Sequence, residues 1–163
     1  MNRLEEIFEL LDWNNSEVEQ AAGVALAKQL DDFSPLFQPL TERYNKNVWD
    51  NCAIVLAAKT DEQLSPFAEQ LFEWTADLNW PGAVTILERI KRISSGDTFL
   101  SAAIAAVRQA KAEDDTSWKW WLSELLECVF FSKNLPEETI VQLETVSACC
   151  PTKKRKFLYK LTQ

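Results

Sequence analysis

Apolar residues recur at helical spacing along almost the whole chain of 163 residues. In the first such stretch, near residues 2–11, Leu4, Ile7, Phe8 and Leu11 fall on one side of a helix. The chain contains three glycines, six prolines and few runs of β-branched residues, so it has few signals for tight turns or strands. This pattern predicts an all-α protein.

Capping and turn signals divide the pattern into eight or nine helices. Ser16 and Glu19 form an S-x-x-E capping box for a second helix that reaches about Leu30. Pro35 and Pro39 argue against helix in the next connection. Further helices are expected at about 46–58, after Ser65-Pro66 as far as Leu78, from Pro81 to 90, at 97–110, at 117–131, from Pro136 and from Pro151.

Short helices joined by short turns favour antiparallel hairpins that stack on one another. A weak internal echo supports stacking, since Leu11-Asp12-Trp13 and Leu78-Asn79-Trp80 both lie at helix–turn–helix junctions. We expect one helical domain over residues 1–163, built as a short HEAT-like α-solenoid. An irregular helical bundle, which could use the same turn twice, is the alternative.

Composition excludes most catalytic chemistry. The chain has no histidine, which removes the usual general base near neutral pH and every histidine metal site. It also lacks a CxxC pair and a glycine-rich phosphate loop. We therefore expect no enzyme activity, no catalytic residue, no metal and no cofactor. The remaining enzymatic possibility is general acid–base catalysis by a pair of carboxylates, although nothing in the sequence marks one pair among the 25 acidic residues.

The cysteines and the apolar runs indicate a cytoplasmic protein. Cys52 and Cys128 lie on apolar helical stripes and are expected in the core, and Cys149-Cys150 is interpreted as a helix-end pair rather than a redox pair. No apolar stretch approaches the roughly 20 residues that span a bilayer. The acidic N-terminus lacks the layout of a signal peptide.

Charge is unevenly distributed around a net value of −8. Residues 61–80 carry five acids and no base, and there Glu69, Glu73 and Asp77 form an i, i+4, i+8 stripe opposite the apolar face. This stripe is either a solvated helix face or a docking surface for a cationic partner. The basic segment KKRKFLYK (153–160) is too short, on an acidic protein, to predict nucleic-acid binding.

The stretch DDTSWKWWLSELLECVFF (114–131) combines two apolar faces. On a continuous helix, the core face consists of Trp118, Trp121, Leu122, Leu125 and Val129. The nearly opposite face consists of Trp120, Glu124, Glu127 and Phe131. That second face is either an exposed aromatic anchor for a partner or a surface covered by a neighbouring hairpin.

Three segments resemble a family of small bacterial helical proteins whose recognisable feature is an L-x-W-P junction. The junction is Leu78-Asn79-Trp80-Pro81, and the resembling segments are 10–28, 46–74 and 77–90. Nothing in 113–163 shares the resemblance. It implies a compact HEAT-type domain without established enzymatic activity, and several members resemble immunity proteins of polymorphic toxin and contact-dependent growth-inhibition systems.

The leading hypothesis is therefore an immunity protein that occludes a cognate basic, nuclease toxin domain as a monomer in a 1:1 complex. A general helical-repeat adaptor without a toxin partner is the alternative. The expected partner-binding residues are Glu69, Glu73, Asp77, Asp114, Asp115, Trp120, Glu124 and Glu127. The motif residues Asn47, Trp49, Asn51, Asn79, Trp80 and Pro81 are interpreted as structural.

Overall fold

The computed structural model describes residues 2–149, which contain helices and no strand. The expected all-α class is confirmed, while the helix expected from Pro151 lies outside the described residues. No helix within residues 2–149 combines the length and the apolar character that crossing a bilayer requires. The α-helices are α1 (Arg3–Leu11), α2 (Glu17–Ala27), α3 (Lys46–Ala57), α4 (Asp61–Leu64), α5 (Ala68–Trp74), α6 (Ala83–Ile90), α7 (Asp97–Ala112), α8 (Thr116–Leu122), α9 (Val129–Asn134) and α10 (Glu137–Cys149). Short 3-10 helices are η1 (Ser34–Leu36), η2 (Ser65–Phe67) and η3 (Ser123–Glu127).

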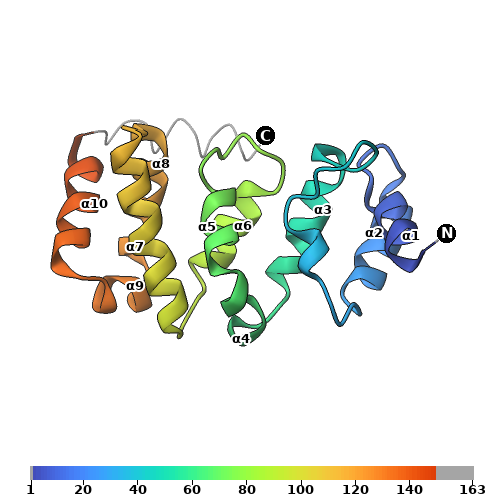
Figure 1. Cartoon of the computed structure of the whole chain (residues 1–163), viewed down its shortest axis with the longest axis horizontal. Helices are drawn as coiled ribbons and strands as arrows, with labels where there is room; N and C mark the ends of the chain where they lie inside the picture. Colours follow the sequence, from blue (N-terminus) through green and yellow to red (C-terminus); the bar gives the residue numbers. More distant parts are fainter. Residues whose placement is uncertain (1, 150–163) are drawn as a thin grey trace.

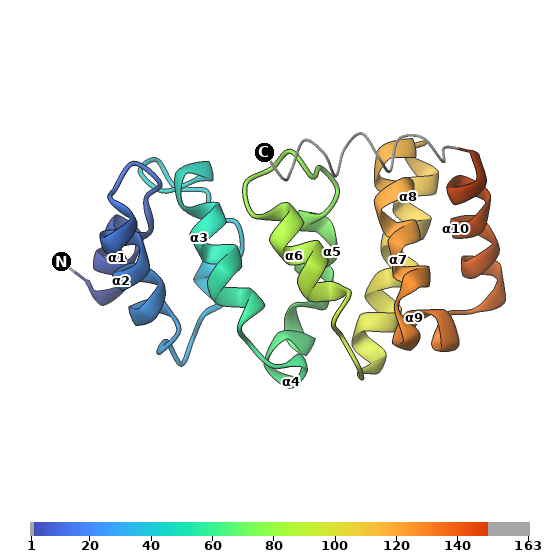
Figure 2. The same cartoon turned by 180° about the vertical axis from the view of Figure 1, so that it is seen from behind.

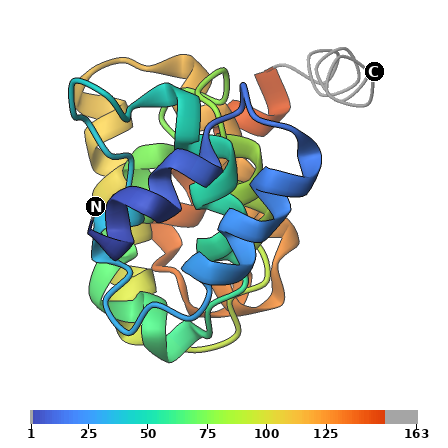
Figure 3. The ribbon, with the colours of Figure 1, turned by 90° about the vertical axis from the view of Figure 1, so that its right-hand side faces the viewer.

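The helices stand side by side in a row along the long axis of the molecule (Figure 1). α2, α3 and α6 contact one another in succession on one side of the row, and α5 contacts α7 on the other (Figure 2). Figure 3 looks along this row, with the α1–α2 pair in front and the remaining helices behind it. The stack therefore has the expected repeat-like form, in which each layer chiefly contacts its neighbours.

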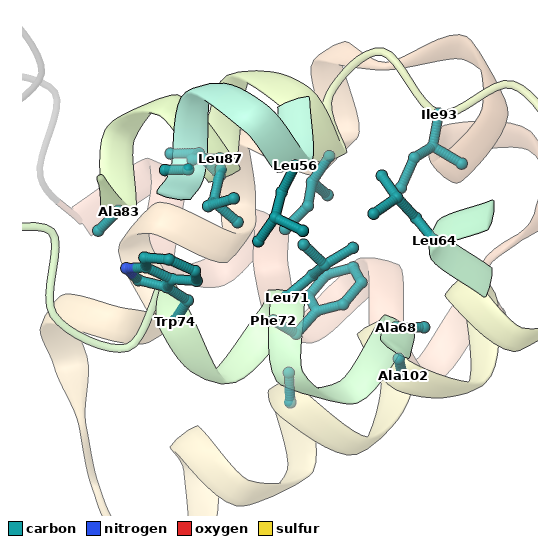
Figure 4. Packing of buried hydrophobic residues seen from close by; sticks show 14 of the residues in the cluster. Leu56, Leu64, Ala68, Leu71, Phe72, Trp74, Ala83, Leu87, Ile93 and Ala102 are labelled. Carbon is teal, nitrogen blue, oxygen red and sulfur yellow. The ribbon is translucent and has the colours of Figure 1, made fainter. Parts of the chain in front are cut away.

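One apolar core runs through the described layers. Between α3, α4, α5 and α6, the side chains of Leu56, Leu64, Leu71 and Leu87 point toward one another and are buried (Figure 4). Burying a leucine contributes about 1.5–3 kcal/mol. The inner face expected for residues 46–58 is confirmed, because its four positions are fully buried: Val48, Cys52, Val55 and Leu56.

Two buried cations cap the ends of helices in the preceding layer. The Lys59 ammonium donates to the Lys28 carbonyl oxygen just after α2 (3.1 Å) and lies 4.7 Å from the centroid of the Phe33 ring. The Arg89 guanidinium donates to the Lys59 carbonyl oxygen just after α3 (2.9 Å) and to the Asp61 carboxylate (2.6 Å). Donor and acceptor are 31 residues apart in the first contact and 30 in the second. We call this arrangement the cation ladder; it also opposes the negative ends of the helix dipoles.

An aspartate turn repeats at the opposite edge of the row, where the α1–α2 and α5–α6 loops lie (Figure 1). Asp12 Oδ1 accepts from the backbone N–H and the side-chain amide of Asn14, both at 2.8 Å. Asp77 Oδ1 accepts from the same two groups of Asn79, at 2.9 and 2.8 Å. The repeated unit is thus Asp-x-Asn. Its two copies are 65 residues apart, whereas the two Leu-x-Trp copies are 67 apart, so the structural repeat and the sequence repeat differ by two residues.

Two asparagines fasten α3 to the α1–α2 junction. The Asn47 side chain donates to the Asp12 carboxylate. The Asn51 side chain donates to the Leu11 carbonyl oxygen and to the Gln20 side-chain oxygen, both at 2.8 Å. Their expected structural role is confirmed, because they satisfy groups at a helix end and join adjacent layers.

The Leu-x-Trp-Pro junction packs against α3. Trp80 lies edge-on to Trp49, with ring centroids 6.1 Å apart, and Trp49 also meets Trp74 at 6.0 Å. Trp74 Nε1–H donates to the Pro81 carbonyl oxygen (3.0 Å). The structural role expected of Trp49, Trp80 and Pro81 is therefore confirmed.

We expect Gly82→Ala to lower the free energy of unfolding by about 2–4 kcal/mol. Gly82 has φ of +78°, and a Cβ there would lie 2.6 Å from Ala53 Cβ and 2.8 Å from the Trp49 carbonyl oxygen. Urea denaturation measures the change. Thr85→Ala, at a partly exposed position of α6, is the control and should stay within about 0.5 kcal/mol. Equal stability of Gly82→Ala and wild type would contradict the close approach of α6 to α3.

We expect Asp61→Asn to make stability less dependent on acid pH. Asp61 accepts from Ser94 N–H (3.0 Å), Ser94 Oγ (3.1 Å) and Arg89. Burial raises the pKa of Asp61, but these bonds and the Arg89 charge outweigh it and hold the pKa below its ordinary value. The resulting stabilisation is present above the unfolded pKa of about 3.9 and is lost as pH falls through the folded pKa.

The free energy of unfolding, measured by urea denaturation between pH 2 and 7, should therefore fall more shallowly in Asp61→Asn than in wild type. Asp50→Asn, at an exposed carboxylate that forms no ion pair within residues 2–146, should keep the wild-type slope. Identical slopes for Asp61→Asn and wild type would contradict the favourable environment of the Asp61 carboxylate.

Candidate functional site

The tryptophan-rich segment forms three short elements instead of one helix. α8 ends at Leu122, η3 follows, and Cys128 is extended (φ −97°, ψ 125°) before α9 begins. A 3-10 helix advances about 120° per residue, and the extended residue changes the chain direction, so a single helical wheel fails after Leu122. The expectation that Val129 faces the core is wrong: it is 67% exposed, whereas Phe131 is fully buried.

Trp120 is buried, so it is not the exposed aromatic anchor that one interpretation required. It is 8% exposed, and its ring lies edge-on to Trp121 at a centroid distance of 4.3 Å. α10 packs against α8 and η3, which agrees with the alternative in which a neighbouring helix covers this side. Trp118 is buried as expected and donates from Nε1 to Thr75 Oγ1 (3.4 Å), while Trp121 is only partly buried.

We expect Trp120→Ala to cost about 3–5 kcal/mol of unfolding free energy, because it removes a large side chain from a covered position. Chemical denaturation followed by circular dichroism measures the loss. Trp13→Ala, at a tryptophan that is 47% exposed, should cost much less. A Trp120→Ala midpoint equal to that of wild type would argue that Trp120 contributes little to packing.

The three aspartates expected to bind a partner each have a contact within the chain. Asp115 caps α8, accepting from the Trp118 backbone N–H at 2.8 Å. Asp114 pairs with Lys119 at 3.0 Å. Asp77 lies beyond α5, which ends at Trp74, so the three-residue helical stripe is wrong at this position; its carboxylate closes the Asp-x-Asn turn instead.

Glu124 is neutralised within the chain. Its carboxylate lies 3.0 Å from the Lys91 ammonium, which also contacts Glu88 at 2.9 Å. Burial lowers the pKa of Lys91, but the two carboxylates outweigh it and raise the pKa above its usual range. Glu127 is exposed and borders an open groove of about 630 Å³ that also includes Cys128.

Glu69 and Glu73 lie one turn apart on α5, and both carboxylates are exposed. Neither has a hydrogen bond or ion pair with another residue in the described range 2–149. Both line a cavity of about 150 Å³ between α5 and α7, which we call the α5–α7 slot. The other lining residues are Phe72, Ala102, Ala105, Ala106, Gln109 and Trp118.

The slot has an apolar interior and a charged border. Phe72 and Trp118 are 1% and 2% exposed, so the slot reaches down to buried aromatic side chains. Ala102 and Ala106 are buried on α7 while Ala105 is exposed, which leaves space without long side chains. Figure 4 shows Ala102 of α7 facing α5 beside Ala68. Such a site can bind a cationic side chain with an apolar stem.

The described residues contain no arrangement for metal or thiol chemistry. Among residues 2–146, whose side chains are described, no group of three or more Cys, Asp or Glu side chains is placed to hold a metal ion. Cys52 and Cys128 are buried free thiols, as expected, and burial raises the pKa of both. A raised pKa leaves little reactive thiolate at neutral pH. The Cys149-Cys150 pair lies outside the residues whose side chains are described.

Sequence reasoning found the α5 side of the slot and missed the α7 side. Ala102, Ala105 and Ala106 recur at helical spacing in the run SAAIAAV, which is a signal for close approach of a neighbouring helix. The run does not say which helix approaches. Only the contact between α5 and α7 places these alanines beside Glu69 and Glu73.

A family model described as a domain of unknown function, DUF5071, matches residues 45–156. The match begins just before α3 and includes the Leu-x-Trp-Pro junction, both sides of the α5–α7 slot and the tryptophan-rich segment. α1 and α2 precede the matched region. No curated protein and no solved structure matches the chain.

Proposed function

The chain belongs to the DUF5071 family, and we propose that it is an immunity protein that binds a cognate nuclease toxin domain and neutralises it by stoichiometric occlusion. The complex is 1:1, forms in the cytoplasm and involves neither nucleic acid nor membrane. The observation that carries the proposal is the pair of exposed, unpaired carboxylates, Glu69 and Glu73, at the mouth of an apolar slot.

The charge balance of the described region supports a basic partner. All 25 acidic residues and 12 of the 17 basic residues lie between residues 2 and 149. Two of these cations, Lys59 and Arg89, are buried in the cation ladder, and Lys91 and Lys119 are paired with carboxylates. The 25 acidic and 12 basic residues give this region a net charge of −13, and an acidic surface speeds association with a positively charged protein.

A nuclease toxin has the complementary surface, because a protein that binds polyanionic RNA or DNA presents cations to the phosphates. An acidic protein that covers those cations competes directly with the nucleic acid. Blocking of this kind requires neither a catalytic residue nor a cofactor on the inhibitor. The resemblance of the Leu-x-Trp-Pro region to immunity proteins supports the same function.

The test is co-expression of this chain with a toxic nuclease domain encoded beside its gene. Cell survival, together with recovery of a 1:1 complex by size-exclusion chromatography, is the expected result. Cell death in the presence of abundant, soluble chain would overturn the immunity proposal. Recovery of partners from ordinary metabolism, without protection, would favour the general helical-repeat adaptor.

We expect Glu69→Lys with Glu73→Lys to slow association with the toxin domain by tenfold or more and to reduce protection, because attraction becomes repulsion. Stopped-flow measurements at two ionic strengths give the rate and its salt dependence. Asp31→Lys with Asp50→Lys makes the same charge change at exposed positions outside the slot and is the matched control. Equal association rates for the two double variants would place the interface away from α5.

A further inference from the structure

The α5–α7 slot has the dimensions and chemistry of a pocket for one long side chain. Its volume is about 150 Å³, its α7 wall is made of three alanines and Gln109, and its interior reaches Phe72 and Trp118. Glu69 and Glu73 stand on the α5 wall. An aliphatic stem can lie against the alanines while its charged end meets the two carboxylates.

Within residues 2–146, no basic side chain pairs with Glu69 or Glu73. Arg108 and Lys111 lie on the exposed surface of α7, yet neither forms an ion pair within the described residues. At the partly buried Glu124, by contrast, Lys91 supplies the neutralising charge. The described residues thus supply no counterion to Glu69 and Glu73, and a ligand that pairs with these carboxylates must be positively charged.

We propose that the slot receives an arginine side chain presented by the protein partner, an inference that rests on the proposed function. A guanidinium is planar and donates in a fork, so it can bridge two carboxylates one helical turn apart. A lysine ammonium cannot form this fork and binds more weakly there.

The direct test uses an alanine-based helical peptide with arginine at every fourth position, and matched peptides with lysine or citrulline at the same positions. Binding is followed by backbone amide NMR at residues 69–73 and 102–109. The arginine peptide should bind about tenfold more tightly than the citrulline peptide, and more tightly than the lysine peptide. Equal binding of arginine and citrulline peptides, or no binding of the arginine peptide at millimolar concentration, would overturn the proposal.

A steric variant separates the slot from general charge attraction. Ala105→Leu fills the slot from an exposed position of α7 without altering charge, and leucine is a good helix former. It should weaken arginine-peptide binding about tenfold, whereas Ala25→Leu, at an exposed position of α2, should bind like wild type. Thermal midpoints establish that both variants fold. Wild-type affinity in Ala105→Leu would overturn the proposal.

The two proposals fail in different ways. If wild type protects cells and Ala105→Leu with Glu73→Gln protects equally, immunity stands and the arginine slot is wrong. If wild type does not protect but the arginine peptide binds in the slot and Ala105→Leu blocks it, the slot stands and the immunity function is wrong.

Discussion

The cation ladder links the layers that contain α2, α3 and α6. The last carbonyl groups of α2 and α3 point to one edge of the stack, where burial would leave them without water. Lys59 and Arg89 reach back from the following layer and supply the missing donors. A buried cation is stable only when it is paired and hydrogen-bonded, so each contact tolerates little displacement between layers. Asp61 completes the pairing at Arg89.

The α5–α7 slot depends on how α5 packs, because α5 contributes both to the core and to the slot. Leu71, Phe72 and Trp74 point into the core, while Glu69 and Glu73 lie one turn apart on the outer face. Packing of α5 on α6 therefore also determines where the two carboxylates stand relative to α7. Alanines on α7 let the helices approach while leaving a space beside them. A shift of one layer would change both the cavity and the spacing of its charges.

Local features were predictable from the sequence, and features that depend on distant partners were not. The Ser16–Glu19 capping box and the inner face of α3 are confirmed, because each depends on residues within one or two helical turns. Trp120 was ambiguous because its environment depends on α10. Asp77 was misplaced because α5 ends at Trp74, four residues before the end at Leu78 that the periodic pattern predicts.

The cation ladder could not be predicted from the sequence. Nothing local to Lys59 or Arg89 distinguishes a buried lysine or arginine from a solvated one, since each finds its acceptor about 30 residues earlier in the chain. The same holds for the slot, whose two walls come from separate helices. The sequence supplied the carboxylates and the alanines; only the fold brings them together.

The carboxylates of this fold form two groups: some hold the structure together, and others are available to bind a partner. Asp12, Asp61, Asp77 and Asp115 accept hydrogen bonds that define turns and helix ends, so their charge is already used. Glu69 and Glu73 support no such contact in the described chain, and as like charges at i, i+4 they cost a few tenths of a kcal/mol. This repulsion stabilises nothing within the described chain, and it is most simply explained by a partner whose binding removes it. A cation entering the slot does so, because it turns the repulsion between the two carboxylates into a shared attraction.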